Sequence, residues 1–301
     1  MMPRHPIASL PAAHDGSSGP AAPRHEVEAE AGAGASRLGF GFTPTDAMVV
    51  ARTDRDGAWG PLATVPYGDL AVSPASAVFN HAQAAFEGLK AQRAADGSIA
   101  LFRPEANARR FQRAAERLAM PPLPIDAFVG AVEQLVRANA RFVPPHGAGS
   151  LYLRPVMMGS GPILGVTPAP SYTFYAFACP VGEYLPGEGR VVVLPRTNRA
   201  APFGTGDVKA AGNYAPTFVP HQAAAARGFK DVLYLDARTE TLIEELGSSN
   251  FFAFRRDGTL VTPSLGTILP GITRDAVLRL ARDAMGWRVE ERPLPLAEVL
   301  A

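Results

Sequence analysis

Strand-like and helix-like segments alternate irregularly along this chain of 301 residues, and that irregular order limits the folds open to it. Strand-like apolar runs occur at 150–158, 171–179, 190–195, 231–236, 250–258, 260–263 and 287–292. Helix-favouring stretches occur at 104–120, 125–142, about 214–227 and 272–285. A doubly wound parallel sheet would show a regular strand–helix alternation. We therefore predict a mixed α/β chain of the α+β class with two layered domains.

Composition changes set the expected domain boundaries. Residues 1–36 are rich in Ala, Gly, Pro and Ser and bury too little apolar area to offset the entropy of ordering, so we expect a disordered N-terminal tail. A small α/β domain is expected over 37–184. An interdomain loop is expected over 185–197, because the Pro- and Gly-bearing segment "PVGEYLPGEG" (180–189) looks like a connection between domains. Residues 198–301 then form the second, larger domain.

Charge, cysteine content and motifs exclude several classes of protein. The net charge of +1, with dispersed arginines, argues against a nucleic-acid partner. The single cysteine, Cys179, rules out an intramolecular disulfide and fits a reducing cytoplasm. The histidines are scattered and HExxH, GxGxxG and GxxxxGK[ST] are absent, so no metal site is expected. The sequence has no apolar run of membrane-spanning length and no signal-peptide pattern. We therefore expect a cytoplasmic protein that does not bind a membrane.

Lysine is scarce, and one lysine stands in an unusual context. The chain holds only Lys90, Lys209 and Lys230 among its 29 basic residues. A lysine amine can lose its proton and form a Schiff base with an aldehyde, which a guanidinium cannot do. Lys209 lies in "GDVKAAGNYA" (206–215), where the small residues that follow it let a flat ring approach the backbone. A lone lysine is ordinarily a solvated charge, so the choice between that role and a Schiff-base role depends on the neighbouring segments.

An aldehyde cofactor such as pyridoxal 5′-phosphate needs an amine, a carboxylate at the pyridine nitrogen, a donor near O3′ and an anion site for its phosphate. Tyr214 offers a phenol five residues after the lysine. The segment "LIEELGSSNFF" (242–252) offers the paired acids Glu244 and Glu245. The ordinary alternative for such a pair is an exposed strand end.

Two further segments suit the phosphate. The turn "LPGITRD" (269–275) leads into a helix whose first free amides, at Ile272 and Thr273, form an anion site. Arg110, in "FRPEANARRF" (102–111), adds a guanidinium that can bind phosphate oxygens. The alternative for the turn is a plain helix start signal.

The whole region from Phe40 to the C-terminus resembles the class IV (fold type IV) aminotransferases, specifically the longer form of branched-chain amino acid aminotransferase. Each matching segment is weakly specific alone, but eight in one order are specific. The matching segments are "FGFTPTDAM" (40–48), "FNHAQAAFEGLKA" (79–91), "LFRPEANARRFQRAAERLAMP" (101–121), "SLYLRPVMMG" (150–159), "CPVGEYLPG" (179–187), "GDVKAAGNYAPT" (206–217), "LIEELGSSNFFAF" (242–254) and "LVTPSLGTILPGITRD" (260–275).

The resemblance implies a role for each candidate residue. Lys209 becomes the Schiff-base lysine and proton carrier, and Tyr214 becomes the O3′ partner. Glu245 rather than Glu244 becomes the partner of the pyridine nitrogen, because the family's acid stands two residues before the glycine. The remaining cofactor residues it implies are Arg110, Ile272 and Thr273 at the phosphate and Ser248 beside the ring.

The same resemblance implies an apolar substrate pocket. Phe40, Tyr152 and the "FEGLKA" segment (86–91) match the pocket for an aliphatic side chain, and Arg154 matches a residue for the acidic co-substrate. Without the resemblance, Phe40 and Tyr152 would be read as ordinary core. His81 stands where the family places a tyrosine, so we expect an altered substrate range.

The implied function is a pyridoxal-phosphate-dependent transaminase that passes the amino group of Leu, Ile or Val to 2-oxoglutarate and works as a homodimer. Family members run several dozen residues beyond "LPLAEVLA" and carry a Gly-Thr-Ala turn there, so we expect the large domain to be incomplete. The alternatives are a D-amino acid aminotransferase or an aminodeoxychorismate lyase, against which "SLYLRPV" and the long first half argue, and a catalytically impaired homologue that binds the cofactor or forms dimers.

Overall fold

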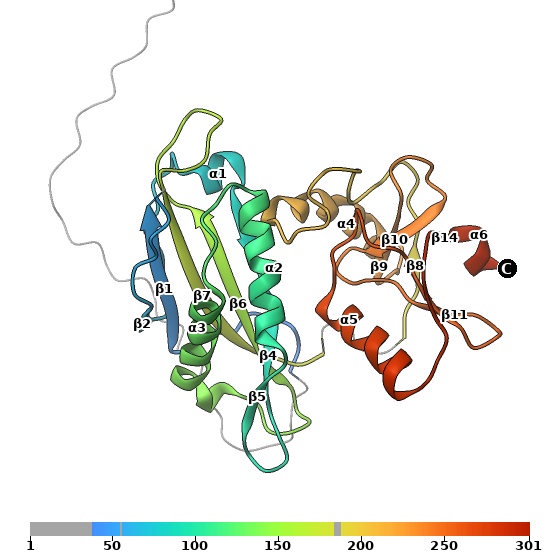
Figure 1. Ribbon diagram of the computed structural model, residues 1–301, viewed down its shortest axis with the longest axis horizontal. Coiled ribbons are helices and arrows are strands. Elements are labelled where there is room, and N and C mark those ends of the chain that lie inside the picture. The colour runs from blue at the N-terminus through green and yellow to red at the C-terminus, as the bar shows by residue number, and fades with distance from the viewer. Residues whose placement is uncertain (1–37, 55, 184–187) are drawn as a thin grey trace, which may run out of the picture. The chain divides into compact units, whose positions relative to one another are not determined.

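The structure is a computed structural model that describes residues 38–54, 56–183 and 188–301, and a seven-stranded sheet organises its first half (Figure 1). The predicted tail, 1–36, lies outside the described residues. Neighbouring strands pair in the order β2–β1–β7–β6–β4–β5, β3 also pairs with β6, and every one of these pairs is antiparallel. The strands are β1 (Ala47–Asp54), β2 (Ala63–Pro66), β3 (Ala84–Phe86), β4 (Leu89–Arg93), β5 (Ile99–Leu101), β6 (Ser150–Gly159) and β7 (Ser171–Val181).

Two helices cover one face of this sheet. α2 (Pro104–Arg117) and α3 (Ile125–Ala138) pack against each other, while α3 also contacts β1 and β7 (Figure 1). β7 alternates in the usual strand manner, so Phe174 points into the core while Tyr175 and Phe177 point away. The ring of Phe174 lies 6.0 Å from that of Phe111 in the core. The opposite face of the sheet is therefore free to carry a site.

The second half contains two smaller sheets. One runs β14 (Leu294–Pro295), β10 (Leu242–Leu246), β9 (Asp231–Leu235), β8 (Val191–Val192), and the other runs β11 (Ala253–Phe254), β12 (Leu260–Thr262), β13 (Val289–Glu291). Its helices are α4 (Phe218–Ala226), α5 (Ile272–Arg279) and α6 (Leu296–Leu300), and a short α1 (Ala77–His81) belongs to the first half. The predicted mixed α/β class is thus confirmed. Residues 37–301 form one contact-defined unit, and the predicted domain boundary within them stays a prediction.

Three predicted element boundaries were wrong for local reasons. The strand predicted over 250–258 is reduced to β11, because a tight turn at 255–258 follows it, in which Gly258 has a φ of 82° in the left-handed region. The helix predicted from 214 begins at Phe218, after two short 3₁₀ turns. The helix predicted to residue 120 ends at Arg117, since Ala119 has a φ of 52°.

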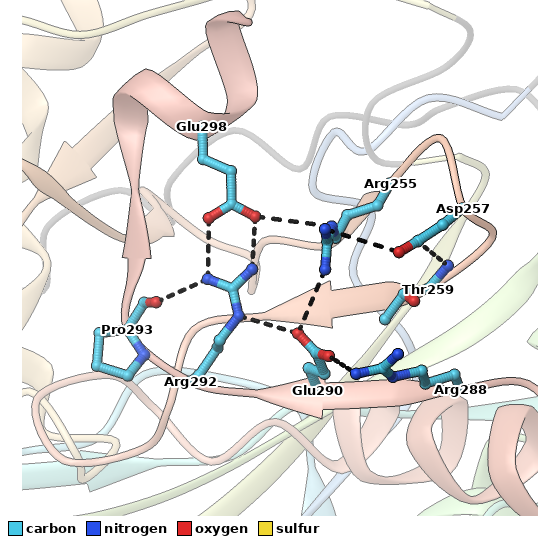
Figure 2. Close-up of polar contacts among 8 residues, drawn as sticks. All are labelled: Arg255, Asp257, Thr259, Arg288, Glu290, Arg292, Pro293 and Glu298. Atoms are coloured by element: carbon cyan, nitrogen blue, oxygen red, sulfur yellow. Dashed lines mark hydrogen bonds and ion pairs between the residues drawn. The ribbon is translucent and has the colours of Figure 1, made fainter.

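A partly exposed network of ion pairs links the last helix, α6, to β13 and to the turn after β11 (Figure 2). Arg292 donates two hydrogen bonds to Glu298 and a third, at 3.0 Å, to Glu290. Arg255 lies 3.9 Å from Glu290 and 4.0 Å from Glu298. Single surface ion pairs contribute little stability, but a network that shares partners contributes more.

No helix in the described ranges is long and apolar enough to cross a membrane.

Candidate functional site

Lys209 lies in a loop that side-chain hydrogen bonds and a neighbouring strand fix in place. The Asn213 amide donates to the carbonyls of Thr205, at 2.7 Å, and Val208, at 3.0 Å. The Thr205 hydroxyl in turn donates to the Asn213 side-chain oxygen at 2.6 Å. On the other side, the Phe86 amide at the end of β3 donates to the Lys209 carbonyl at 3.1 Å. The backbone around the lysine is therefore held from both directions.

The Lys209 amine sits between two aromatic rings. Its Nζ donates to the Tyr214 hydroxyl at 2.9 Å and lies 4.5 Å from the centroid of the Phe86 ring. The Phe86 and Tyr214 rings meet edge to face at 4.8 Å. The amine is half-buried, and its hydrogen bond to Tyr214 fixes where it points.

Glu245 is buried on β10 and is surrounded by donors. Its Oε1 accepts from the Leu269 amide at 3.1 Å and pairs with the Arg199 guanidinium at 2.6 Å. Its Oε2 accepts from the Asn250 side chain at 2.8 Å. Burial raises the pKa of Glu245 to about 7, and the nearby charges of Arg199 and Lys209 oppose that rise.

Glu244, the adjacent acid, faces different partners. Its Oε1 accepts a short hydrogen bond from the Thr267 hydroxyl. Burial raises its pKa as well. The alternative of an exposed strand end is wrong for both acids, since Glu244 is 7% and Glu245 3% exposed.

Arg110 is buried on α2 and bonded to Glu87. The Arg110 Nε donates to Glu87 Oε1 at 2.7 Å and its Nη2 donates to Glu87 Oε2 at 2.8 Å. Its remaining terminal nitrogen, Nη1, donates to the Pro270 carbonyl at 3.3 Å. The sequence-predicted arginine therefore reaches the turn that precedes α5.

The amides of Ile272, Thr273 and Arg274 at the start of α5 come before its first helical hydrogen bond and have no intrahelical acceptor. The first helical bond joins the Asp275 amide to the Gly271 carbonyl at 2.9 Å. Gly271 is needed for space, because a Cβ there would overlap the Asn250 side-chain oxygen. Asp275 also pairs at 2.6 Å with Arg103, the N-cap residue of α2, so the start of α5 is held beside the start of α2.

Tyr152 and Arg154 stand on β6, on the sheet face turned away from the helices. Arg154 donates to the Tyr152 hydroxyl from Nε at 3.2 Å and from Nη2 at 3.0 Å, and its guanidinium lies 4.6 Å from the Phe86 ring centroid. The Phe40 ring meets that of Tyr152 at 5.5 Å. A Cβ on Gly88 would overlap the Tyr152 hydroxyl. Phe86 thus contacts both the lysine and the predicted substrate arginine.

Two predicted residues lie apart from this group. His81 is exposed at the end of α1, and Ser248 is exposed in the turn after β10. No hydrogen bond, ion pair or ring contact of the described residues joins either of them to Lys209.

The described part of the chain also brings together no group of three or more His, Cys, Asp or Glu side chains that could hold a metal ion.

Sequence reasoning placed Phe86 and Glu87 in the predicted pocket segment (86–91) without a role of their own, although an acid between apolar residues was a usable signal. It missed Arg199 altogether. Arg199 carried no such signal, because it stands in a Pro-bearing loop among many dispersed arginines.

The chain matches known proteins along most of its length. The profile of the family described as "Amino-transferase class IV" matches residues 84–301. A chloroplastic branched-chain-amino-acid aminotransferase of Arabidopsis thaliana is 45% identical over 269 residues, covering 88% of this chain and 64% of that protein. A branched-chain-amino-acid aminotransferase of Haemophilus influenzae is 42% identical and is covered to 77% by this chain. A methionine aminotransferase of Arabidopsis thaliana is 45% identical and is covered to 75%.

The chain also resembles solved structures of branched-chain aminotransferases. The branched-chain aminotransferase of Thermoproteus uzoniensis superposes with a TM-score of 0.70 at 28% identity, over 84% of this chain and 80% of that one. The Escherichia coli branched-chain amino acid aminotransferase gives a TM-score of 0.70 at 27% identity, over 83% and 78%. The chain therefore belongs to the class IV aminotransferases, a family of pyridoxal-phosphate-dependent enzymes, and groups within it with the branched-chain aminotransferases.

Proposed function

We propose that this protein is a branched-chain amino acid transaminase that uses pyridoxal 5′-phosphate and passes the amino group of Leu, Ile or Val to 2-oxoglutarate. The observation that carries the proposal is the Lys209 amine, which donates a hydrogen bond to the Tyr214 hydroxyl at 2.9 Å. The buried Glu245 lies near enough for the charge of Lys209 to lower its pKa. Amine, phenol and carboxylate are the three groups that the ring of this cofactor requires.

The described residues fit the cofactor at its phosphate as well. The free amides of Ile272 and Thr273 at the start of α5 attract an anion, and Arg110 stands beside them with Nη1 on the Pro270 carbonyl. The Nε and Nη2 atoms of Arg110 are bonded to Glu87, so the Nη1 atom is the one directed at the turn. The donor set therefore matches a phosphorylated aldehyde, and Lys209 would hold its carbonyl carbon.

When bound, the cofactor withdraws electrons from the amino acid and makes its Cα–H bond acidic. Lys209, as a free amine, would take the proton from Cα and deliver it to the former aldehyde carbon of the cofactor, and it would move a proton in the reverse direction in the second half-reaction. Tyr214 positions that amine through its hydrogen bond, and Glu245, when ionised, holds a proton at the ring nitrogen. Phe86 covers one side of the amine and limits the access of water.

The substrate side chain and the acidic co-substrate would meet different parts of one wall. Phe40, Tyr152 and Phe86 offer aromatic surface to an aliphatic side chain, and Arg154 offers a positive charge to the second carboxylate of 2-oxoglutarate. An apolar wall separates side chains that differ by one methylene by only about 1–3 kcal/mol, or roughly 10–200-fold in kcat/KM, so Leu, Ile and Val should all be substrates. Methionine is a useful comparison because one relative is named for it.

The test is glutamate formation from 2-oxoglutarate by the purified protein with added cofactor. Leu, Ile, Val and Met are compared with Asp, Phe and D-Ala, and Lys209→Arg serves as the inactive control. We expect the branched substrates to exceed Asp and Phe by at least about tenfold in kcat/KM. Faster turnover of D-Ala than of L-Leu, or no turnover that depends on Lys209, would refute the proposal.

We also propose a homodimer in the cytoplasm. The rings of Phe42, Tyr67 and Phe177 have centroids 5.8–6.3 Å apart, and Phe42 is 58% exposed. An exposed aromatic cluster of this kind is typical of a surface that a second copy covers. Sedimentation equilibrium of wild type and Phe42→Ser tests the dimer, and cell fractionation tests the location.

A further inference from the structure

Arg199 occupies a buried position between two of the groups assigned to the cofactor ring. Its side chain is 3% exposed, and its Nη1 lies 2.6 Å from Glu245 Oε1. The guanidinium carbon lies 5.9 Å from the centroid of the Tyr214 ring. Its Nη1 also approaches the Gly206 carbonyl at 3.5 Å, in the loop that carries Lys209. A single guanidinium thus contacts both the acid and the phenol.

The charges around Glu245 leave Arg199 as its main counterion. Lys209 also favours the ionised acid, but its amine is the reacting group and does not stay a fixed cation. Glu244 disfavours the ionised form through its own negative charge. The remaining partners, the Leu269 amide and the Asn250 side chain, are neutral donors. An acid buried to this degree would otherwise become neutral by taking up a proton.

We propose that Arg199 is a positioning residue that keeps the Glu245 carboxylate ionised and directed at the ring nitrogen of the cofactor. The inference rests on the proposed function, because it assumes that Glu245 meets that nitrogen. Arg199 itself touches neither the substrate nor the reacting carbon. Its short contact with Oε1 leaves Oε2 to the Asn250 amide, so the orientation of the carboxylate is fixed from both sides.

The experiment measures the affinity of the apo protein for two ligands across pH 5–9, by quenching of protein fluorescence. One ligand is pyridoxal 5′-phosphate, and the other is its 1-deaza analogue, in which a C–H group replaces the ring nitrogen. The wild type should prefer the natural cofactor. An opposite charge at this distance shifts a carboxyl pKa by about 1–3 units, so Arg199→Met should move the pH midpoint of this preference upward by at least about one unit. At pH 7 the preference should fall about tenfold.

Further variants separate a charge effect from a packing effect. Arg199→Gln keeps hydrogen-bond donors but loses the charge, and it decides the matter if Arg199→Met does not fold. Arg199→Lys keeps the charge, and it should shift the pH midpoint of the cofactor preference less than Arg199→Met or Arg199→Gln does. The matched control is Arg274→Met, which removes a second buried arginine, 4% exposed and paired with Glu291 at 2.9 Å. This control should lower stability and leave the preference for the natural cofactor unchanged.

The outcomes are distinct. A fall in the preference for the natural cofactor in Arg199→Met and Arg199→Gln, with no fall in Arg274→Met, supports the inference. An equal loss of affinity for both ligands, or an unmoved midpoint, overturns it while leaving the proposed function intact. If the wild type binds neither ligand, the cofactor assignment fails and this inference fails with it.

Discussion

Arg110 and Glu87 form a buried, two-point ion pair, with Nε to Oε1 at 2.7 Å and Nη2 to Oε2 at 2.8 Å. Glu87 is fully buried, and Asn107 donates a further bond to its Oε2 at 2.8 Å. The geometry fixes the guanidinium plane, so its Nη1 edge faces Pro270 and the start of α5. Glu87 thereby orients an arginine that a phosphate would contact.

Removing Glu87 should therefore destabilise the fold as well as the site. Glu87→Ala leaves the Arg110 charge buried without a counterion, and we expect a loss of about 3–5 kcal/mol in the free energy of unfolding. Urea denaturation measures it. Glu133→Ala, which breaks an exposed pair with Arg137, should cost less than about 1 kcal/mol. Equal losses in the two variants would contradict this account.

Lys209 should be the residue that carries the cofactor. Lys209→Ala and Lys209→Arg should both abolish transamination and the visible absorbance of the lysine-bound cofactor, because neither side chain can form the Schiff base. Loss of the proton transfer alone should cost about 10²–10⁴-fold in rate. Borohydride reduction followed by peptide mapping tests the assignment. A label on Lys90 or Lys230 would show that it is wrong.

The two adjacent acids should differ in their effects. Glu245→Gln removes the charge that faces Arg199 and the ring nitrogen. Glu244→Gln alters a bond to Thr267 and removes a negative charge that disfavours ionised Glu245, so it leaves the acid at the ring nitrogen in place. We expect the first half-reaction to slow at least about tenfold more in Glu245→Gln. Single-turnover measurements with L-Leu provide the comparison, and equal rates in the two variants would count against the assignment.

Glu245 should also make the stability of the apo protein depend on pH. Its pKa is raised from 4.5 to about 7 by burial, so its favourable contribution is present below pH 4.5 and is lost as pH rises through 7. The full change corresponds to about 3 kcal/mol. Urea unfolding of wild type and Glu245→Gln between pH 4.5 and 8 tests it. The stability of wild type relative to the variant should fall with rising pH, and a constant difference would exclude Glu245 as the source.

The ion-pair network of α6 should respond to pH in the opposite direction (Figure 2). The Arg292 guanidinium lowers the pKa of Glu298 and of Glu290, so their contribution is present above pH 4.5 and is lost as pH falls further. Arg292→Gln should speed amide hydrogen exchange in residues 296–300 at neutral pH, and 1 M salt should do so in wild type. Arg137→Gln, remote from α6, is the control. Unchanged exchange in Arg292→Gln would show that the network does not hold the helix.

Local patterns in the sequence predicted the parts of the fold that depend on nearby residues. The helix at 125–142 was visible from its apolar spacing, and Lys209 stood out because lysine is rare here. The end of α3 was not visible, because Asn139 exchanges hydrogen bonds with the backbone of Ala47, which is distant in sequence. The pairing of Arg199 with Glu245 was hidden for the same reason. Such partners are set by tertiary packing, which no short segment encodes.

Gly88 and Tyr152 are in close steric contact, and this contact constrains which substitutions each position can accept. Gly88 is not in the left-handed region, so its value lies in its missing volume rather than in backbone freedom. The Tyr152 ring is held by Phe40 and Arg154 and has no simple way to withdraw. Any larger residue at 88 would be tolerated only after 152 had become smaller. The order of substitutions is thus constrained, and lineages that exchange the tyrosine first gain access to pocket shapes closed to the others.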